Sequence, residues 1–293
     1  MTRTPYPATL PAILVEDAVA AALREDLGRA GDVTSCAVVA PDAQARAAIV
    51  AREAGRLCGV DFARAAFEMQ RAGLRVEPLA RDGDALAPGQ AALRVEGSAR
   101  AILAGERVAL NFMCHLSGIA TQAARFVAAA AGTRARVCDT RKTTPGLRAF
   151  EKYAVRCGGA ANHRFGLDDA ILIKDNHIAV AGGVAQAVAA ARAYAGHLMA
   201  IEVEVDTLAQ LREALEAEVE AVLLDNFPLE ALREAVAINR AAPRPARLEA
   251  SGGVTLETVP AIAAAGVDFI SSSRLTMGAG TLDLGLDIEI AGA

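Results

Sequence analysis

A cluster of basic side chains near the middle of the chain points most directly to chemistry. Between Asp139 and His177 lie the segments DTRKTTPGLR, YAVRCGGAANHR and ILIKDNHI, and this stretch is net positive although the 293-residue chain has a formal charge of −5. Glycines and short apolar runs separate the cations, so they do not form a solvated basic tail. Cations held on turns at strand ends suit a small polyanion.

Three of these cations are placed to bind carboxylates. Arg141 and Arg164 each offer a planar fork of donors, and Lys174 offers a point charge. Each charged hydrogen bond contributes roughly 1.5–3 kcal/mol, so several of them predict a ligand with more than one negative group. For any one of them alone, a weak surface ion pair is the competing interpretation. His163 fits either a structural or a binding role, and His177 is expected in a loop that supports Lys174.

A strand of alternating acids, IEVEVD, follows the basic cluster. A period of two puts Glu202, Glu204 and Asp206 on one face, and we expect that face to point into a barrel. Buried carboxylates are costly unless they are paired or bind a metal, so a salt-bridged layer is a serious alternative for Glu202. Glu204 is nearest the strand end, and Asp225 ends the next strand. These two carboxylates could hold Mg²⁺ (magnesium) through water and ribose hydroxyls.

The segment EASGGVTLETV indicates a phosphate site. It puts Ser251, Gly252 and Gly253 between a strand and a helix, where backbone N–H groups can bind an anion. Gly-Gly loops are also common turns, so this signal is weak alone, but Lys142 and the pair Ser272-Ser273 are compatible with phosphate as well. The chain has no GxxxxGK[ST] loop and no complete GxGxxG fingerprint, which disfavours an ordinary nucleotide-binding fold.

Six short apolar runs after Arg136 must carry these residues. Helical stretches alternate with the runs, and successive run ends are roughly 20–35 residues apart, the length of a βα unit. At least six such units predict a parallel barrel or a doubly wound sheet. We favour a barrel, because each run ends in a reactive residue and barrels place their chemistry at these strand ends. The runs are Val137–Thr140, Ile171–Lys174, Ile201–Val205, Val222–Asn226, Leu248–Gly252 and Phe269–Ser273.

The first third of the chain reads as a small α+β unit. Helical periodicity covers residues 13–25, and a shorter helix is expected over 61–71. Residues 44–60 predict a strand pair around Glu53-Ala54-Gly55, and the segments 74–80 and 91–97 predict two further strands. Residues 99–131 form one long helix or two, interrupted near Ser117-Gly118. The alternating segment 281–290 is expected to return as a strand to this unit.

One stripe of the long helix is polar. Arg107, Asn111, His115 and Gln122 share it by i, i+4 spacing, which suits an interface or the edge of a pocket, with a solvated face about as common.

Bulk properties exclude several classes of protein. The five cysteines are odd in number and scattered without a CxxC pair, which argues against a disulfide framework or zinc site and favours a reducing, cytoplasmic compartment. Cys138 and Cys157 are expected to be packed thiols. The N-terminus has no apolar segment of signal-peptide length, and no run approaches the roughly 18 apolar residues of a membrane span. An acidic chain with 4% aromatics disfavours nucleic acid as a partner.

Several long motifs together resemble the quinolinate phosphoribosyltransferase family. They are GERVALNFMCHLSGIAT, DTRKTTPGLRAFEKYAVRCGGAANHRFGLDDAILIKDNHI, IEVEVD, LLDNF and EASGGV. The resemblance implies an N-terminal α/β sandwich domain over 1–113, to which residues 277–293 return, and an incomplete, seven-stranded, TIM-like α/β barrel over 114–276. It also implies a homodimer, with assembly into hexamers left open, whose active site receives an arginine from the partner subunit.

The same resemblance implies roles for individual residues. Arg107 matches the arginine donated to the partner, and Lys142 matches the lysine near the pyrophosphate and the reacting centre. Glu204 and Asp225 match the acids that serve the ribose hydroxyls and Mg²⁺. The residues matching the quinolinate cradle and its neighbourhood are Thr140, Arg141, His163, Arg164 and Lys174, and those matching the phosphate loops are Ser251, Gly252, Gly253, Ser272 and Ser273.

The implied reaction is transfer of a phosphoribosyl group from phosphoribosyl pyrophosphate (PRPP) to quinolinate with loss of CO₂, a step of NAD biosynthesis. The chain departs from the family pattern at Ser273, where a glycine is usual, and at Met277, where a lysine or histidine is frequent. The alternatives are a related phosphoribosyltransferase that uses nicotinate, or a molybdenum-transport accessory homologue. A lyase that forms a Schiff base on Lys174 and an anion-binding protein without catalysis are the rivals from other classes.

Overall fold

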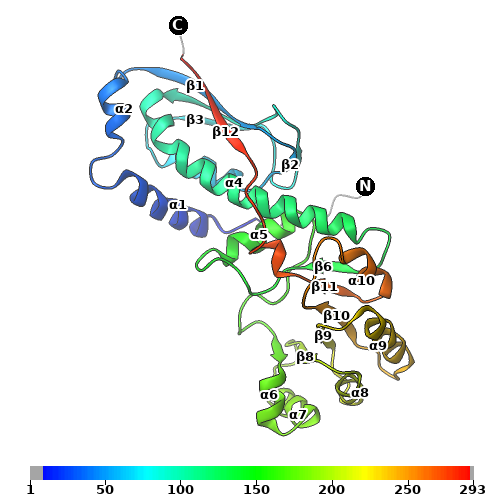
Figure 1. Ribbon diagram of the computed structural model, residues 1–293. Helices are drawn as coiled ribbons and strands as arrows, with labels where there is room; N and C mark the ends of the chain where they lie inside the picture. The colour runs from blue at the N-terminus through cyan, green and yellow to red at the C-terminus, as the bar shows by residue number, and fades with distance from the viewer. Residues whose placement is uncertain (1–8, 291–293) are drawn as a thin grey trace. The chain divides into compact units, whose positions relative to one another are not determined.

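The computed structural model describes residues 9–290, and its helices and strands are labelled in Figure 1. Contacts divide the chain into two compact units. The first comprises the described residues of Met1–Ala124, Ala149–Gly159 and Ala279–Ala293, and the second comprises Arg125–Arg148 and Ala160–Gly278. Residues 1–8 and 291–293 of the expected N-terminal domain and its return lie outside the described residues. The domain bounds 1–113 and 114–276 stay a prediction.

The first unit is built from short helices and antiparallel strands. Its elements in chain order are α1 (Ala12–Leu27), α2 (Val33–Val38), β1 (Gln44–Ala51), β2 (Gly55–Arg56), α3 (Val60–Glu68), β3 (Arg75–Pro78), β4 (Ala85–Leu86), β5 (Ala91–Ser98) and β12 (Leu284–Ile290). Two helices, α4 (Ala99–Ala129) and α5 (Arg148–Cys157), begin in one unit and end in the other.

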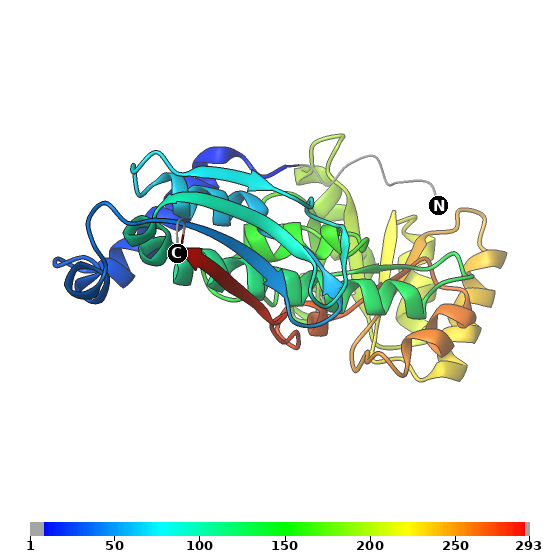
Figure 2. The same ribbon diagram turned by 90° about the horizontal axis from the view of Figure 1, so that it is seen from above.

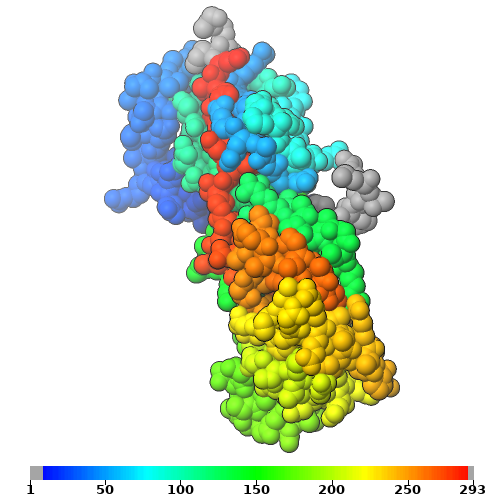
Figure 3. Space-filling model, turned by 45° about the vertical axis from the view of Figure 1, so that its right-hand side comes forward, coloured from blue at the N-terminus to red at the C-terminus, as the bar shows by residue number. Residues whose placement is uncertain are grey.

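A four-stranded antiparallel sheet organises the first unit, in the order β12-β1-β5-β3. The predicted return of segment 281–290 is confirmed, because Ala47 of β1 pairs with Ile288 of β12. Figure 2 shows the red C-terminal strand beside blue β1, and Figure 3 shows it as a band across the blue and cyan residues. The predicted strand pair within 44–60 is wrong. Both edges of β1 are taken by β12 and β5, so β2 pairs with β4 instead.

The long helix α4 runs without a break through Ser117-Gly118. These two residues serve tertiary contacts instead. The Ser117 hydroxyl donates to the carbonyl of Cys58 at 3.0 Å and accepts the N–H of the same residue at 2.9 Å. A Cβ on Gly118 would lie 1.9 Å from the carbonyl oxygen of Gly280, so glycine lets the returning chain pack directly on the helix. The interruption suggested by the small residues is therefore a packing site.

The second unit contains a six-stranded, wholly parallel sheet in the order β6-β11-β10-β9-β8-β7. Its strands are β6 (Arg136–Cys138), β7 (Ile171–Ile173), β8 (Ile201–Val205), β9 (Ala221–Asp225), β10 (Arg247–Ser251) and β11 (Phe269–Ser271). All six predicted apolar runs are strands of this sheet. A parallel bridge between Cys138 and Ala161 adds one more pairing beside β6.

Helices connect these parallel strands. They are α6 (Asp175–Ala181), α7 (Val184–Tyr194), α8 (Leu208–Glu216), α9 (Leu229–Ala241) and α10 (Val259–Ala265), followed after β11 by the 3₁₀ turn η1 (Ser273–Leu275). Figure 1 shows α9 and α10 lying beside β10 and β11. On β8, the side chains of Ile201, Val203 and Val205 are buried, and Glu202 and Glu204 alternate with them, as the period of two predicts. Within residues 9–290, no helix has the length and apolar character needed to cross a membrane.

Candidate active site

Residues predicted to bind or react follow the carboxyl ends of the six parallel strands. Because all six strands run in the same direction, these ends lie on one edge of the sheet, where α/β proteins place their ligands. Strand by strand, the residues are Thr140, Arg141 and Lys142 after β6, Lys174 after β7, Glu204 near the end of β8, Asp225 at the end of β9, Ser251 at the end of β10 and Ser272 after β11.

Two arginines of the basic cluster hold buried nitrogens without a hydrogen-bond partner. Across residues 9–290, the Nε atoms of Arg141 and Arg164 make no hydrogen bond. One terminal nitrogen of Arg164 donates to the carbonyl of Ala170 at 3.0 Å. Burial lowers the pKa of Arg164, and the positive charge of Arg141 lowers it further. Buried, like-charged donors are unfavourable unless an anion compensates them, so this pair indicates a ligand carrying negative charge.

A third arginine shapes the loop that carries this pair. The Arg148 guanidinium donates to the carbonyls of Arg141 at 3.2 Å and Phe165 at 3.3 Å, and to the Thr143 hydroxyl at 3.1 Å. These three bonds join the segment after β6 to the segment that follows Arg164. Arg148 therefore holds the loop in shape, while Arg141 keeps its Nε free.

Lys142 extends from a turn fixed by two threonines. The Thr140 hydroxyl accepts the N–H of Lys142 at 3.0 Å, and the Thr276 hydroxyl donates to the Lys142 carbonyl at 2.7 Å. The side chain of Lys142 is exposed, whereas Thr276 is buried. Thr276 was not predicted from the sequence, because its role depends on a contact between distant segments of the chain.

Glu204 and Asp225 stand on neighbouring strands, since Val205 of β8 pairs with Leu224 of β9. The Glu204 carboxylate forms an ion pair with the ammonium of Lys174. Asp225 accepts a hydrogen bond from the Asn226 amide at 2.8 Å. Both carboxylates offer hard oxygen atoms, the donor type that Mg²⁺ prefers.

Two neighbours of these residues lie differently from the prediction. Asp206 is exposed beyond the end of β8, and its N–H donates to the Gln210 side chain at 2.9 Å, so it does not continue the alternation of the strand. His177 lies in α6 and not in a loop. Its Nδ1 accepts the N–H of Lys174 at 2.9 Å, so the expected support of Lys174 is confirmed.

Glu202 belongs to a polar layer inside the sheet's edge. The Nε2 atom of His163 lies 3.0 Å from Glu202 Oε2 and 3.6 Å from Glu249 Oε1. Burial raises the pKa of Glu249 to about 7, and the charge of Glu202 contributes to the rise. A salt-bridged layer was one of the predictions for Glu202. Glu249 was not predicted to belong to it, although a glutamate inside the apolar strand RLEAS is itself a signal.

The Ser251-Gly252-Gly253 turn is held against the neighbouring strand end. The N–H of Asn226 donates to the Ser251 carbonyl at 2.9 Å. Gly252 has a φ of +88°, and a Cβ there would lie 2.2 Å from Asn226 Oδ1, so this position requires glycine. Gly253 also has a positive φ, +60°, but nothing lies within 4 Å of its virtual Cβ. The turn exposes both glycines, as an anion site of backbone N–H groups would need.

The loop after β11 is tied to the same edge. Ser272 is buried, its N–H donates to the Cys138 carbonyl at 3.1 Å, and its hydroxyl donates to the Val254 carbonyl at 3.1 Å. The hydroxyl of Ser272 thus joins two loops. Ser273 begins η1 and is half-buried, and Met277 is 61% exposed. Neither of the two residues that depart from the family pattern is therefore part of a buried core.

Arg107 lies on α4 in the first unit, where its side chain is exposed. Asn111, one turn later, is exposed as well. His115 is engaged within the unit, because its Nε2 lies 3.1 Å from a carboxylate oxygen of the buried Glu151. The polar stripe of α4 is therefore open to solvent at its N-terminal part.

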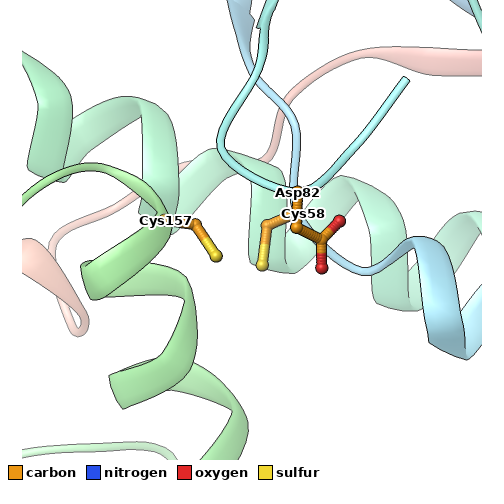
Figure 4. Close-up of side chains that lie close together, drawn as sticks. All are labelled: Cys58, Asp82 and Cys157. Atoms are coloured by element: carbon orange, nitrogen blue, oxygen red, sulfur yellow. The ribbon is translucent and has the colours of Figure 1, made fainter. Parts of the chain in front are cut away.

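A second cluster in the first unit joins Cys58, Asp82 and Cys157, whose ligand atoms lie within 4.8 Å of one another. Figure 4 shows the two sulfur atoms facing each other. Asp82 accepts the N–H of Val60 at 3.1 Å and the Tyr153 hydroxyl at 2.9 Å. Burial, followed by the hydrogen bond with Cys157, raises the pKa of Cys58 well above its ordinary value.

Metal ligands must be deprotonated, so this cluster is better explained as buried structural thiols. The expectation that Cys138 and Cys157 are packed thiols is confirmed by their burial. The closeness of Cys58 and Cys157 could not be inferred from their spacing.

Fold and site together define an α/β protein that gathers cationic and carboxylate side chains at the carboxyl ends of a parallel sheet. The sequence profile described as "Quinolinate phosphoribosyl transferase, N-terminal domain" matches residues 32–117, and the profile of the C-terminal domain matches residues 119–287. The chain belongs to the quinolinate phosphoribosyl transferase family.

Individual relatives match over almost the whole length. The nicotinate-nucleotide pyrophosphorylase [carboxylating] of Mycobacterium leprae is 44% identical over 274 residues, which cover 93% of this chain and 96% of the relative. The solved structure of the nicotinate-nucleotide pyrophosphorylase from Francisella tularensis has a TM-score of 0.92 and 38% identity, covering 98% of this chain and all of that chain. The structure of NadC from Streptococcus pyogenes also has a TM-score of 0.92, at 41% identity and with 97% and 99% of the two chains covered.

Proposed function

We propose that the protein is a quinolinate phosphoribosyltransferase that acts in NAD biosynthesis. It would transfer the phosphoribosyl group of PRPP to the ring nitrogen of quinolinate and release pyrophosphate and CO₂, leaving nicotinate mononucleotide. The family membership and the printed names of relatives at about 40% identity support this activity. Both domain profiles of the family match, one after the other, along the chain.

The pair of buried, unpartnered guanidinium nitrogens on Arg141 and Arg164 carries the proposal. A substrate with two carboxylates supplies the negative charge that these groups lack, and bidentate contacts would orient its ring. Lys174 would add a third cation. In the free protein its ammonium is paired with Glu204, so substrate binding would share or replace that ion pair.

The sugar donor would occupy the adjoining strand ends. The N–H groups of Ser251, Gly252 and Gly253 would bind the 5′-phosphate, with Ser272 and Ser273 beside it. Glu204 and Asp225 would hold the ribose hydroxyls. Lys142, exposed on its turn, would meet the negative charge that develops on the departing pyrophosphate.

The proposed reaction proceeds in two successive steps, transfer of the ribosyl group and then loss of CO₂. The lone pair of the ring nitrogen attacks C1 of the ribose, while the C1–O bond breaks and its electron pair leaves with pyrophosphate. The nitrogen is then a pyridinium, which accepts the electron pair of the adjacent carbon–carboxylate bond as CO₂ departs. A proton from solvent restores the aromatic C–H. Arg141 and Arg164 would hold the ring in line with C1, and orientation of this kind lowers the barrier of a two-substrate reaction.

Glu204 and Asp225 are the residues that would hold Mg²⁺. Their carboxylates end adjacent parallel strands, a donor set that fits a hard divalent cation. When bound, the ion would neutralise charge on the pyrophosphate and the ribose oxygens.

Three further features belong to the same proposal. The Cys138–Ala161 bridge beside the six strands supports an incomplete, seven-stranded barrel. The exposed position of Arg107 supports a homodimer in which this arginine completes the partner's site. Five free cysteines among the described residues support a reducing, cytoplasmic compartment.

Release of CO₂ from carboxyl-labelled quinolinate tests the proposed function directly. We expect release only when PRPP is present, with one pyrophosphate formed for each CO₂. Nicotinate, which lacks the second carboxylate, is the matched control substrate and is expected to turn over far more slowly. Efficient turnover of nicotinate, or no label released from quinolinate, would reject the assignment.

A further inference from the structure

The imidazole of His163 is hydrogen-bonded on both sides within the protein. Its Nδ1 accepts the backbone N–H of Arg164 at 2.7 Å, and its Nε2 lies 3.0 Å from Glu202 Oε2. The backbone N–H of His163 donates to Asp139 Oδ1 at 2.9 Å. The side chain of His163 is 13% exposed. These contacts leave the ring little opportunity to reach a ligand directly.

The bonding pattern determines where the ring hydrogen is. Since Nδ1 accepts a hydrogen bond, it carries no hydrogen, and the neutral ring must carry its hydrogen on Nε2. That Nε2–H donates to the Glu202 carboxylate. Glu249 lies on β10, which is separated from β8 by β9. Its Oε1 lies 3.6 Å from the same Nε2 and has no hydrogen-bond partner in residues 9–290.

We propose that Glu202 and Glu249 act through His163 to position Arg164 for quinolinate. We also propose that Glu249 is neutral when Arg141 and Arg164 bind the quinolinate dianion. This inference rests on the proposed function and refines it. His163 is then a positioning residue, which fixes the main chain of Arg164 through Nδ1, and it does not touch quinolinate.

The surroundings of Glu249 agree with a neutral acid. It is buried, and the titratable groups that face it are Glu202 from β8, His163 from the segment after α5 and Cys138 from β6, whose sulfur lies 3.8 Å from Glu249 Oε2. The hydroxyl of Ser271 on β11 is also nearby. Two ionised carboxylates on one imidazole would add a second negative charge behind the cradle, where it would oppose the binding of a dianion.

The same three residues have the composition of a metal site, but the hydrogen bonds disfavour it. A cation bound at Nε2 would displace the ring hydrogen there. Nδ1 would then have to carry the hydrogen, and the bond from the Arg164 N–H would be lost. Binding of a metal ion by these three residues would therefore contradict the positioning role of His163.

The two ring nitrogens can be tested separately by amide side chains. The oxygen of asparagine can take the place of Nδ1, whereas the amide of glutamine reaches toward the place of Nε2. We expect His163→Asn to bind quinolinate within about threefold of the unmodified protein, and His163→Gln and His163→Ala to bind it about tenfold or more weakly, a loss of the size expected for one misplaced charged contact. The Kd for PRPP should change less than twofold in all three. If glutamine preserves quinolinate binding and asparagine does not, the ring contacts the substrate through Nε2 and the proposal is wrong.

The charge of Glu249 is tested by the pH dependence of binding. Calorimetry between pH 6 and pH 8.5 should show the Kd for quinolinate rising about tenfold in the unmodified protein, as Glu249 loses its proton. In the isosteric, uncharged variant Glu249→Gln, the Kd should be flat over this range. The neutral glutamine should bind as the unmodified protein does at pH 6. An unchanged pH dependence in Glu249→Gln would overturn the role of Glu249.

Two further outcomes separate this inference from the proposed function. If the unmodified protein does not bind quinolinate at any pH, the proposed function itself is wrong. If Mn²⁺ or Zn²⁺ binds with a stoichiometry of one that Glu249→Gln and Glu202→Gln both abolish, the cluster is a metal site and the positioning role is rejected.

Discussion

At the scale of single residues, the candidate site contains several groups whose burial is unfavourable in the free protein. Burial and the charge of Arg141 lower the pKa of Arg164, and burial and the charge of Glu202 raise the pKa of Glu249. Buried guanidinium nitrogens without hydrogen-bond partners and an acid with a raised pKa are typical of functional sites, where stability is lower than the local packing would allow. The loop bonds of Arg148 and Thr276 hold these groups in place.

Replacement of Arg164 tests whether its charge serves the ligand. We expect Arg164→Ala to raise the KM for quinolinate roughly ten- to hundredfold, the equivalent of one charged hydrogen bond, and to change the KM for PRPP less than threefold. Steady-state kinetics with each substrate varied in turn provide the measurement. Arg233, which is exposed and paired with Glu230 on α9, is the control, and Arg233→Ala should change neither constant. Equal effects of Arg164→Ala on both substrates would contradict its assignment.

Glu249 should also make stability depend on pH. Its pKa is about 7 in the folded protein against 4.5 ordinarily, so the folded state holds the proton between these values while the unfolded chain loses it. The stability that this group contributes is complete below pH 4.5 and is lost as the pH rises through 7, by about 3 kcal/mol. Urea unfolding at pH 5 and pH 8 should show a smaller fall for Glu249→Gln than for the unmodified protein. Parallel pH profiles would contradict the raised pKa.

At the scale of elements, the parallel strands bring distant loops to one edge, and close contacts then join the loops. Asn226 after β9 holds the turn after β10, and Ser272 after β11 reaches Val254 beyond that turn. Glycine is needed where such contacts leave no room. Gly118 in α4 and Gly252 in the turn both lie against neighbouring backbone or side-chain oxygens.

Two adjacent glycines provide a matched pair for testing the turn. Both Gly252 and Gly253 have a positive φ, so alanine strains either position by on the order of 1 kcal/mol. Only at Gly252 would the new methyl group also collide with Asn226. We expect Gly252→Ala to weaken PRPP binding at least tenfold and Gly253→Ala to weaken it about threefold, measured by calorimetry with the unmodified protein alongside. Equal losses would show that backbone conformation alone, and not contact with Asn226, limits this turn.

At the scale of the whole molecule, the chain divides into two units, and the candidate site residues divide with them. Arg107 belongs to the first unit, and the other candidates belong to the second. The exposed Arg107 has no hydrogen bond or ion pair assigned to it among the described residues. In the proposed homodimer, a site completed by the second subunit would give the exposed Arg107 of the first unit a ligand to bind.

Mixed dimers test this shared site. Arg107→Ala and Lys142→Ala should each be inactive alone, because each removes one part of every site. After equimolar mixing with subunit exchange, half of the dimers are mixed and each has one intact site, so about a quarter of the unmodified activity should return. A mixture of Lys142→Ala with Asp225→Asn, whose defects lie in the same part of the site, should stay inactive. No recovery in the first mixture, with exchange demonstrated, would reject the shared site.

Local patterns were sufficient for much of the fold. The six apolar runs are the six parallel strands. The alternation in IEVEVD correctly separated Glu202 and Glu204 from the buried Ile201, Val203 and Val205, because strand periodicity is a property of neighbouring residues. The helix expected over residues 13–25 is also present as α1, which ends at Leu27 before the C-cap Gly28. These features depend on short-range geometry that each segment carries itself.

The tertiary structure alone decided which groups meet. Nothing in the spacing of Glu249 and His163 indicates that they share a cluster, or that Cys58 faces Cys157. The same holds for β2, which pairs with β4 because other strands occupy both edges of β1. Contacts between distant segments depend on strand order and on which edges are already occupied. Sequence therefore determined the elements and their reactive ends, while burial and strand order determined the charges and partners that give those ends their chemistry.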